Sequence, residues 1–484
     1  MSILVNRVQT TLQPSDHPYL NGAWTPNFDE YDADDMEVIG TIPSDIEGIY
    51  VRNTENPVHQ PIGRYHPFDG DGMLHMMRFS RGTAAYKNRF IRTKGFQAEA
   101  EAGEALWAGF TVPPAKSKRP GCGIGSHLRD SSSTDVLVRN GKILSTFWQC
   151  GDGYLLDAES LDTLGIEQWT PVEGLSAHPK LDPKTGELMF FNYGDKAPHM
   201  HYGVVGPDNK LKHYIPIALP GTRLPHDMAI SDNYSVLNDF PLFPIPAALE
   251  NGYFVPQFDA SMKSRFAVLP RYGSPEDVMW FEAEPTYVLH WTNCWEEGDE
   301  VILEGYHQKD PFPPPIDNLP ESYRLIGAGI DLHSFKPHLH RWRFNLKTGE
   351  TREERVCSAE HVEFGNINPD YYGREHRYVY SAHGEKGWFL FNGLVKHDLK
   401  AGTATKVLFG EQRFGSEAPF IKRNGAVDED DGYLVSFVTD MKLDRSECVI
   451  FDAKDLESGP LCRIILPHRI CSGTHATWAN ASEL

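Results

Sequence analysis

The sequence of 484 residues lacks the features that mark several large classes of protein. No apolar run approaches the ~18 residues of a membrane-spanning helix, and the first residues, MSILVNRVQTTLQ, contain no apolar segment long enough for a secretion signal. There are 46 Lys and Arg against 67 Asp and Glu, a formal net charge of −21, which argues against a general nucleic-acid-binding protein. No glycine-rich dinucleotide fingerprint follows a predicted strand, so we expect no organic cofactor.

Cysteine is scarce and its pattern is uninformative for metal or disulfide frameworks. The seven residues are odd in number, scattered and free of Cys-x-x-Cys pairs: Cys122, Cys150, Cys294, Cys357, Cys448, Cys462 and Cys471. Such a pattern indicates reduced thiols in a cytoplasmic protein.

Short β-prone segments separated by turn signals fill most of the chain. Asn140-Gly141 stands between two predicted strands, and another strand follows the turn at Pro183–Gly186. Hairpins about ten residues apart are typical of antiparallel blades around a channel. No WD or kelch repeat is present, and two packed sheets would give a similar strand count, so this pattern indicates an all-β chain without choosing between the two.

Four histidines lie in motif-like stretches that are far apart in the sequence. They are His178 in LSAHPKLDPKTGEL, His226 in LPHDMAISDNY, His290 in YVLHWTNCWEEGDE and His475 in SGTHATWAN. Imidazole is the commonest side-chain ligand for borderline transition metals. Separations of 48, 64 and 185 residues exclude a short finger-type zinc site, so only a fold that returns repeatedly to one axis would gather them. The alternative is that each is an ordinary structural histidine, since the chain has 21.

The segments around these histidines resemble the carotenoid cleavage oxygenase family. The resemblance covers the chain from about Asn21 to Leu484. It begins with NGAWTPNFDE and GTIPSDIEGIYVRN, continues through RYHPFDGDGMLHMMRF, SAHPKLDPKTGEL and HDMAISDNY, and ends with HWTNCWEEGD, GSEAPFIKR and LPHRICSGTHATW. The resemblance implies a seven-bladed β-propeller with an axial metal site and a loop-built cap over the substrate tunnel. We therefore expect one catalytic domain over residues 21–484, preceded by an N-terminal extension of residues 1–20.

The resemblance also implies a chemistry. One Fe(2+) per chain would be held by His178, His226, His290 and His475, with no catalytic residue beyond these ligands. Four neutral imidazoles leave up to two octahedral positions open, which suits O2 activation. The implied enzyme is a dioxygenase that cleaves a conjugated C=C bond of an apocarotenoid or similar polyene into two carbonyl products. The alternatives are the same chemistry on a stilbene or phenylpropanoid alkene, of the hydroxystilbene, isoeugenol or vinylguaiacol type, and a non-catalytic binding propeller.

A metal-bound histidine usually donates its second ring N–H to an acceptor, and the family uses Glu for three of its four histidines. Glu363 in HVEFGNINPDYYG and Glu417 in GSEAPFIKR fill two of these positions. At the third the chain departs from the family, because the match is Gln149 or, after a one-residue shift, Trp148; we favour Gln149. The alternative is that both Glu residues are ordinary surface carboxylates.

Two aromatic residues stand where relatives that act on hydroxylated stilbenes place a Lys and a Tyr to hold the phenol. These are Trp148 and Phe110, neither of which pairs with a phenolate, so we expect an apolar polyene pocket; a place in the core is the alternative. The apolar, proline-rich stretches 106–114, 240–246 and 253–255 are expected to edge the tunnel. They also suggest peripheral membrane contact, and burial under a blade is the competing interpretation.

Two ligand candidates carry structural expectations of their own. Alternation over residues 287–292 predicts a strand that places Val288, His290 and Thr292 on one face. His475 lies only nine residues from the C-terminus, so the tail must be tied into the body. A propeller that closes its last blade with the C-terminal segment would do this.

Overall fold

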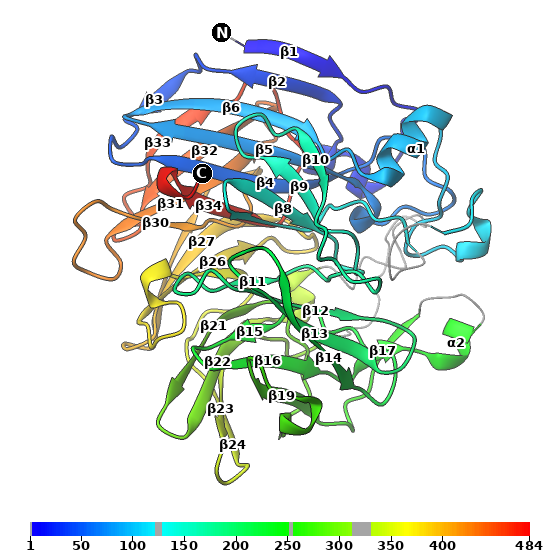
Figure 1. Ribbon diagram of the computed structural model, residues 1–484. Helices are drawn as coiled ribbons and strands as arrows, with labels where there is room; N and C mark the ends of the chain where they lie inside the picture. The colour runs from blue at the N-terminus through cyan, green and yellow to red at the C-terminus, as the bar shows by residue number, and fades with distance from the viewer. Residues whose placement is uncertain (1, 122–127, 251–254, 312–330) are drawn as a thin grey trace.

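The computed structural model describes residues 2–121, 128–250, 255–311 and 331–484, and its strands form seven antiparallel blades of four or more strands (Figure 1). The predicted all-β, seven-bladed propeller is confirmed. Cys122, Tyr253 and Phe254 lie outside the described residues. No helix within these ranges is long and apolar enough to cross a membrane.

The first blade combines both ends of the chain. From the axis outward it consists of β34 (Ala476–Asn480), β4 (Gly48–Asn56), β5 (Asp71–Ser80), β6 (Thr83–Phe90), β2 (Asp29–Ala33) and β1 (Ser2–Arg7). Strand β34 pairs with β4 from Ala476 opposite Arg52 to Asn480 opposite Gly48. The C-terminal segment therefore closes the ring, as predicted from the position of His475.

The second to fourth blades follow in chain order. Their strands, from the axis outward, are β7 (Asp135–Arg139), β8 (Lys142–Thr146), β9 (Tyr154–Asp157) and β10 (Thr163–Ile166); β11 (Lys180–Leu181), β12 (Leu188–Tyr193), β13 (His199–Val205) and β14 (Leu211–Ala218); and β15 (Ala229–Ile230), β16 (Tyr234–Asp239), β19 (Ser264–Pro270) and β20 (Met279–Ala283).

The fifth to seventh blades complete the circle. Their strands are β21 (Trp291–Glu297), β22 (Glu300–His307), β23 (His338–Asn345) and β24 (Thr351–Arg355); β25 (Val362–Asn366), β26 (Tyr378–Gly384), β27 (Phe391–Asp398) and β28 (Thr403–Leu408); and β29 (Arg413–Phe414) with β30 (Phe420–Lys422), both on β31 (Gly432–Asp440), then β32 (Arg445–Asp452), β33 (Pro460–Ile465) and β3 (Val38–Gly40).

Non-blade elements gather beside the propeller. Helices α1 (Lys94–Ala102) and α2 (Pro246–Glu250) and the ribbon of β17 (Leu242–Pro244) and β18 (Pro256–Phe258) lie on the same side, at the right of Figure 1. The proline-rich stretch from residue 240 thus contains a short strand and a helical turn. The remaining helical turns are α3 (Leu332–Phe335), η1 (Pro18–Leu20), η2 (Gly22–Trp24), η3 (Pro67–Asp69), η4 (Pro114–Lys116), η5 (Pro275–Asp277), η7 (Pro369–Tyr371) and η8 (Ala481–Glu483).

The core consists of apolar layers between neighbouring blades. Strand side chains point alternately to the two faces, and each face of a blade packs on the next blade. In β31, for example, Val435 packs toward the first blade and Leu434 toward the sixth. All nine residues of β31 are accordingly buried. This two-sided burial explains why such strands read as continuous apolar runs rather than as alternating ones.

Three further predictions from the sequence can be compared with the structure. Residues 2–7, inside the predicted N-terminal extension, form β1 and pair with β2. The six described cysteines are buried and unpaired. Large apolar side chains in 106–114 and 240–246 are buried or half-buried, while Val255 is 41% exposed; this favours burial over membrane contact for these stretches.

Candidate metal centre

The four candidate histidines occupy equivalent places in four blades. His178, His226, His290 and His475 lie one to three residues before the axial strands β11, β15, β21 and β34. The repeated step of the propeller brings these segments to one axis although they are far apart in the sequence. The strand predicted over residues 287–292 begins only at Trp291, so His290 stands at the entry to its strand and not inside it.

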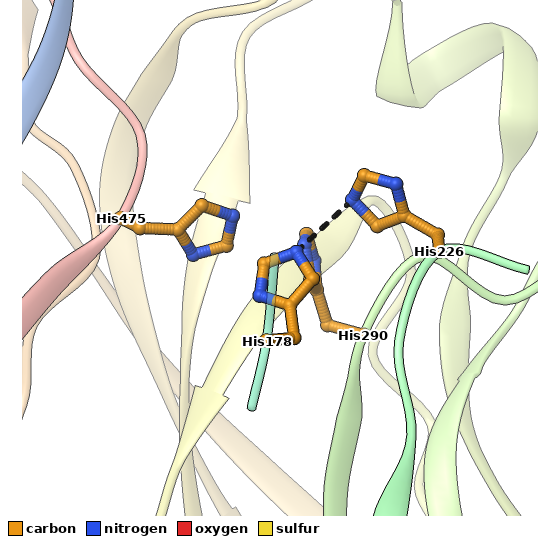
Figure 2. Close-up of side chains that lie close together, drawn as sticks. All are labelled: His178, His226, His290 and His475. Carbon is orange, nitrogen blue, oxygen red and sulfur yellow. Dashed lines mark hydrogen bonds between the residues drawn. The ribbon is translucent and has the colours of Figure 1, made fainter. Parts of the chain in front are cut away.

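The four rings converge on a common point (Figure 2). Each offers one nitrogen, and these atoms all lie within 4.8 Å of one another. The Nε2 atoms of His178 and His226 are 3.3 Å apart, close to the ~3.0 Å expected for two nitrogens at right angles around an ion at ~2.1 Å. Nε2 of His290 is buried and has no hydrogen-bond partner among the described residues. These donors fit a single metal ion.

The protonation states of three of the four rings suit metal binding. Burial lowers the pKa of His178 and His290 well below the usual value, and that of His226 to about 3. Neutral rings present a lone pair to a cation. For His475, burial acts in the same direction, but the hydrogen bond to Glu417 and its charge raise the pKa.

Two carboxylates stand behind the rings where the sequence predicts them. Oε2 of Glu363 lies 2.6 Å from Nδ1 of His290, and Oε2 of Glu417 lies 3.3 Å from Nδ1 of His475. Because a carboxylate oxygen accepts a hydrogen bond from Nδ1–H, each contact directs the opposite nitrogen, Nε2, toward the centre. Neither is an ordinary surface carboxylate: Glu363 is fully buried, and the Glu417 side chain is 15% exposed.

The third contact comes from a residue that sequence reasoning missed. Oδ2 of Asp135, on β7, accepts the backbone N–H of His178 at 3.1 Å and lies 3.2 Å from its Nδ1. His178 has a φ of +63°, a left-handed conformation that is strained for a side chain of this size. Gln149, the predicted partner, makes no hydrogen bond to any of the four rings in the described structure, and its Nε2 is buried without a partner.

A bulge in β25 shapes one wall of the centre. The register against β26 shifts between Glu363 and Asn366, and Phe364 has a φ of +57°. The Phe364 ring stacks on His290 at 4.7 Å and meets His475 edge-on at 4.9 Å. Gly365 is required in the bulge because a Cβ there would collide with the hydroxyl of Tyr306. The bulge thus aims one residue as an acceptor and the next as an apolar cover.

Phe110 and Trp148 lie together close to the ligand segment of the third blade. Their rings meet edge to face with centroids 5.0 Å apart. Trp148 is 8% exposed and belongs to a buried cluster with Ala177, the residue before His178. This position is compatible with a place in the core and with lining of a substrate pocket.

A cavity of about 790 Å³ runs along the propeller axis. Its lining includes one segment from each blade and reaches His178, His290 and His475, while Phe110 and Trp148 are not part of it. Charged groups such as Lys180 and Asp227 line it. This axial cavity therefore approaches the centre between both charged and apolar side chains, and the aromatic pair Phe110 and Trp148 lies outside it.

The fold and the site define a β-propeller with a cluster of four histidines on its axis that could hold a metal ion. The family model RPE65, described as "Retinal pigment epithelial membrane protein", matches residues 24–480. The carotenoid 9,10(9',10')-cleavage dioxygenase of Crocus sativus is 33% identical over 512 residues, covering 96% of this chain and 90% of the relative. The chain belongs to the family of RPE65 and the carotenoid cleavage oxygenases.

Solved structures agree in fold along the whole length. The lignostilbene dioxygenase of Pseudomonas brassicacearum superposes with a TM-score of 0.85 at 27% identity, covering 97% of this chain and 100% of that one. The cobalt-substituted apocarotenoid oxygenase of Synechocystis gives a TM-score of 0.81 at 25% identity, with 98% of both chains covered. The second is a cobalt-substituted protein, so a related propeller accepts a transition metal.

Proposed function

We propose that the chain is a non-haem Fe(II) dioxygenase that cleaves a conjugated C=C bond of an apocarotenoid or similar polyene with O2. His178, His226, His290 and His475 are the proposed ligands of one Fe(2+) per chain. The observation that carries the proposal is the convergence of four imidazole nitrogens within 4.8 Å on the axis. In the reaction the double bond breaks and each carbon gains one oxygen atom of O2, so two carbonyl groups form without a reductant.

When bound, iron supplies the activation of O2 that this cleavage requires. The chain's own residues hold the centre ready for it. Glu363, Glu417 and Asp135 accept ring or backbone N–H groups and keep three imidazoles directed inward. Phe364 covers His290 and limits the access of water on that side.

We also propose that residues 21–484 act as one cytoplasmic catalytic domain on small molecules, with residues 1–20 as an extension. The closure of the ring through β34 supports the single domain, and the unpaired cysteines support the cytoplasmic location.

The decisive experiment is reconstitution followed by product analysis. Metal-free protein is loaded with Fe(2+) under argon, exposed to O2, and offered a panel of apocarotenals beside a panel of hydroxystilbenes and isoeugenol. We expect one iron per chain and two carbonyl products whose oxygens both derive from labelled O2. Active protein that contains stoichiometric zinc and no iron would overturn the proposal.

The alternative substrate class is a stilbene or phenylpropanoid alkene, which the similarity to lignostilbene dioxygenase supports. Phe110 and Trp148 argue against it, because neither side chain accepts the O–H of a buried phenol or carries a positive charge for a phenolate, at a cost on the order of 1–3 kcal/mol. We therefore expect kcat/KM for the best apocarotenal to exceed that for any hydroxystilbene by about tenfold or more. The double variant Phe110→Tyr with Trp148→Lys should move this ratio toward hydroxystilbenes.

The ratio of the two kcat/KM values is the readout, because general damage to the enzyme cancels in it. Phe110→Tyr alone serves as the control, since it adds a hydroxyl without a cation. A hydroxystilbene preferred by the unmodified enzyme would promote the alternative to the primary function.

Asp135 offers a test of the contact that the sequence did not predict. Asp135→Asn keeps the size of the side chain but removes the charge behind His178. Loss of such an outer contact typically lowers metal affinity 10- to 100-fold, and we expect about tenfold because the contact is long, at 3.2 Å. Asp232→Asn is the matched control: this residue lines the same cavity, pairs with Lys184 and is 53% exposed. Equal metal affinities for the two variants would refute the role of Asp135.

A further inference from the structure

One buried carboxylate contacts the segments of three of the four histidines. Asp227 follows His226 directly, and its side chain is 1% exposed. Its Oδ1 lies 2.7 Å from Nζ of Lys180 and accepts the N–H of Met228 at 2.7 Å. Its Oδ2 accepts the N–H of Trp291 at 2.9 Å. Both oxygens are therefore fully engaged.

These partners belong to three consecutive blades. Lys180 begins β11, two residues after His178, and Trp291 begins β21, immediately after His290. Asp227 itself lies between His226 and β15. The carboxylate consequently spans the entry points of the axial strands in the third, fourth and fifth blades. His475, the fourth histidine, has its own support in Glu417, which also accepts the N–H of Ala476 at 2.8 Å.

The energetics of buried ion pairs indicate that the pair of Asp227 and Lys180 holds the strand entries in place and does not chiefly stabilise the fold. Removing two charges from water costs several kcal/mol for each ion, and an apolar pair of similar size is often as stable. The best attested use of a buried ion pair is to fix one arrangement among several. Here the arrangement concerns Lys180, Asp227 and Trp291, each of which lies one or two residues after a histidine.

We propose that Asp227 is a positioning residue that fixes the spacing of His178, His226 and His290 before a metal ion arrives. The inference rests on the proposed function in that these three side chains are taken to be metal ligands. Pre-organised ligands bind more tightly because they lose less freedom on binding. Asp227 does not contact the metal; it acts through the backbone of the fifth blade and the side chain of Lys180.

The test is Asp227→Asn, with Co2+ as the probe and metal-free full-length protein. An amide has one acceptor where the carboxylate has two, so its NH2 group must face either Trp291 N–H or the Lys180 ammonium. We expect the dissociation constant for Co2+ to rise about tenfold and the visible absorption bands of bound Co2+ to shift. A role confined to stability would move the melting temperature but not these bands.

The chain provides a matched control in Lys396 and Asp430. In this Lys–Asp pair the Nζ–Oδ2 distance is also 2.7 Å and the side chains are 13% and 10% exposed, but the pair lies away from the four histidines. Asp430→Asn should leave Co2+ affinity and spectrum unchanged. If Asp227→Asn does not fold, Lys180→Met combined with Asp227→Asn removes both charges, and we expect the same loss of affinity from it.

The outcomes distinguish the metal centre from the positioning role. If the unmodified protein binds no Co2+, the proposed metal centre itself is wrong. If it binds Co2+ and Asp227→Asn binds it with the same affinity and spectrum, only the positioning role is overturned. The positioning role is also overturned if Asp430→Asn alters the spectrum as much as Asp227→Asn does.

Discussion

We expect His290→Ala to lose both its metal and its turnover. The substitution removes one of four converging nitrogens, and Nε2 of His290 has no other partner in the buried centre. It also leaves the buried Glu363 carboxylate without the ring 2.6 Å away. We expect turnover to fall by more than ~100-fold, beyond the range for loss of an outer contact, and bound iron to fall in parallel. Metal analysis and O2 uptake check this.

Two companion variants make the result interpretable. His226→Ala removes a proposed ligand that has no carboxylate behind it in the described structure, so no buried acceptor loses its partner. His376→Ala removes a histidine that is equally buried and pairs with Glu304 at 3.1 Å, but is not one of the four converging rings. Loss of iron in both proposed-ligand variants and retention in His376→Ala is the expected pattern. Normal turnover in His290→Ala or His226→Ala would remove that histidine from the ligand set.

The general architecture is largely readable from the sequence. Turn signals between β-prone segments predict an all-β chain, and the resemblance of the ordered motifs to the carotenoid cleavage oxygenases implies a propeller. The place of His475 near the C-terminus predicts that the tail closes the ring, and β34 on β4 does so. These inferences succeed because they depend on local chemistry and on the order of segments along the chain.

Contacts between blades, by contrast, could not be predicted from the sequence. Asp135 meets His178 across 43 positions of sequence, and Asp227 meets Trp291 across 64. The sequence around each aspartate does not indicate its contact residue, because the contact arises from the way neighbouring blades are arranged around the axis. Asp227, which directly follows His226, is nevertheless a usable signal once the propeller is assumed, because the entries of the axial strands lie close to one another.

The prediction for Gln149 shows the limit of matching by position. The match of Gln149 to a family Glu shows that this carboxylate is missing, but it does not show which residue contacts the histidine in its place. In the structure the carboxylate near His178 comes from β7, while His226 has no acceptor among the described residues. The strand expected through His290 fails for a related reason: alternation describes residues inside a strand, and the ligand lies at its entry, where the backbone turns.

Glu363→Gln should give the largest effect of any change that leaves all four proposed ligands in place. Glu363 is fully buried, and its Oε2 both lies 2.6 Å from Nδ1 of His290 and accepts the N–H of Phe364 at 2.9 Å. An amide of the same size removes the negative charge that favours a cation at the centre. We expect metal affinity and turnover to fall toward the upper end of the 10- to 100-fold range, with the fold intact by circular dichroism.

Glu304→Gln is the matched control, because Glu304 is also fully buried and pairs with a histidine, His376, at 3.1 Å. Glu417→Gln supplies a graded comparison: its contact with His475 is longer, at 3.3 Å, and partly exposed, so its loss should cost less than that of Glu363. Metal affinity is measured as the Fe(2+) dissociation constant, and turnover is measured as kcat. If Glu363→Gln loses no more affinity than Glu304→Gln, the carboxylate behind His290 supports only the fold, and the orienting role assigned to it is wrong.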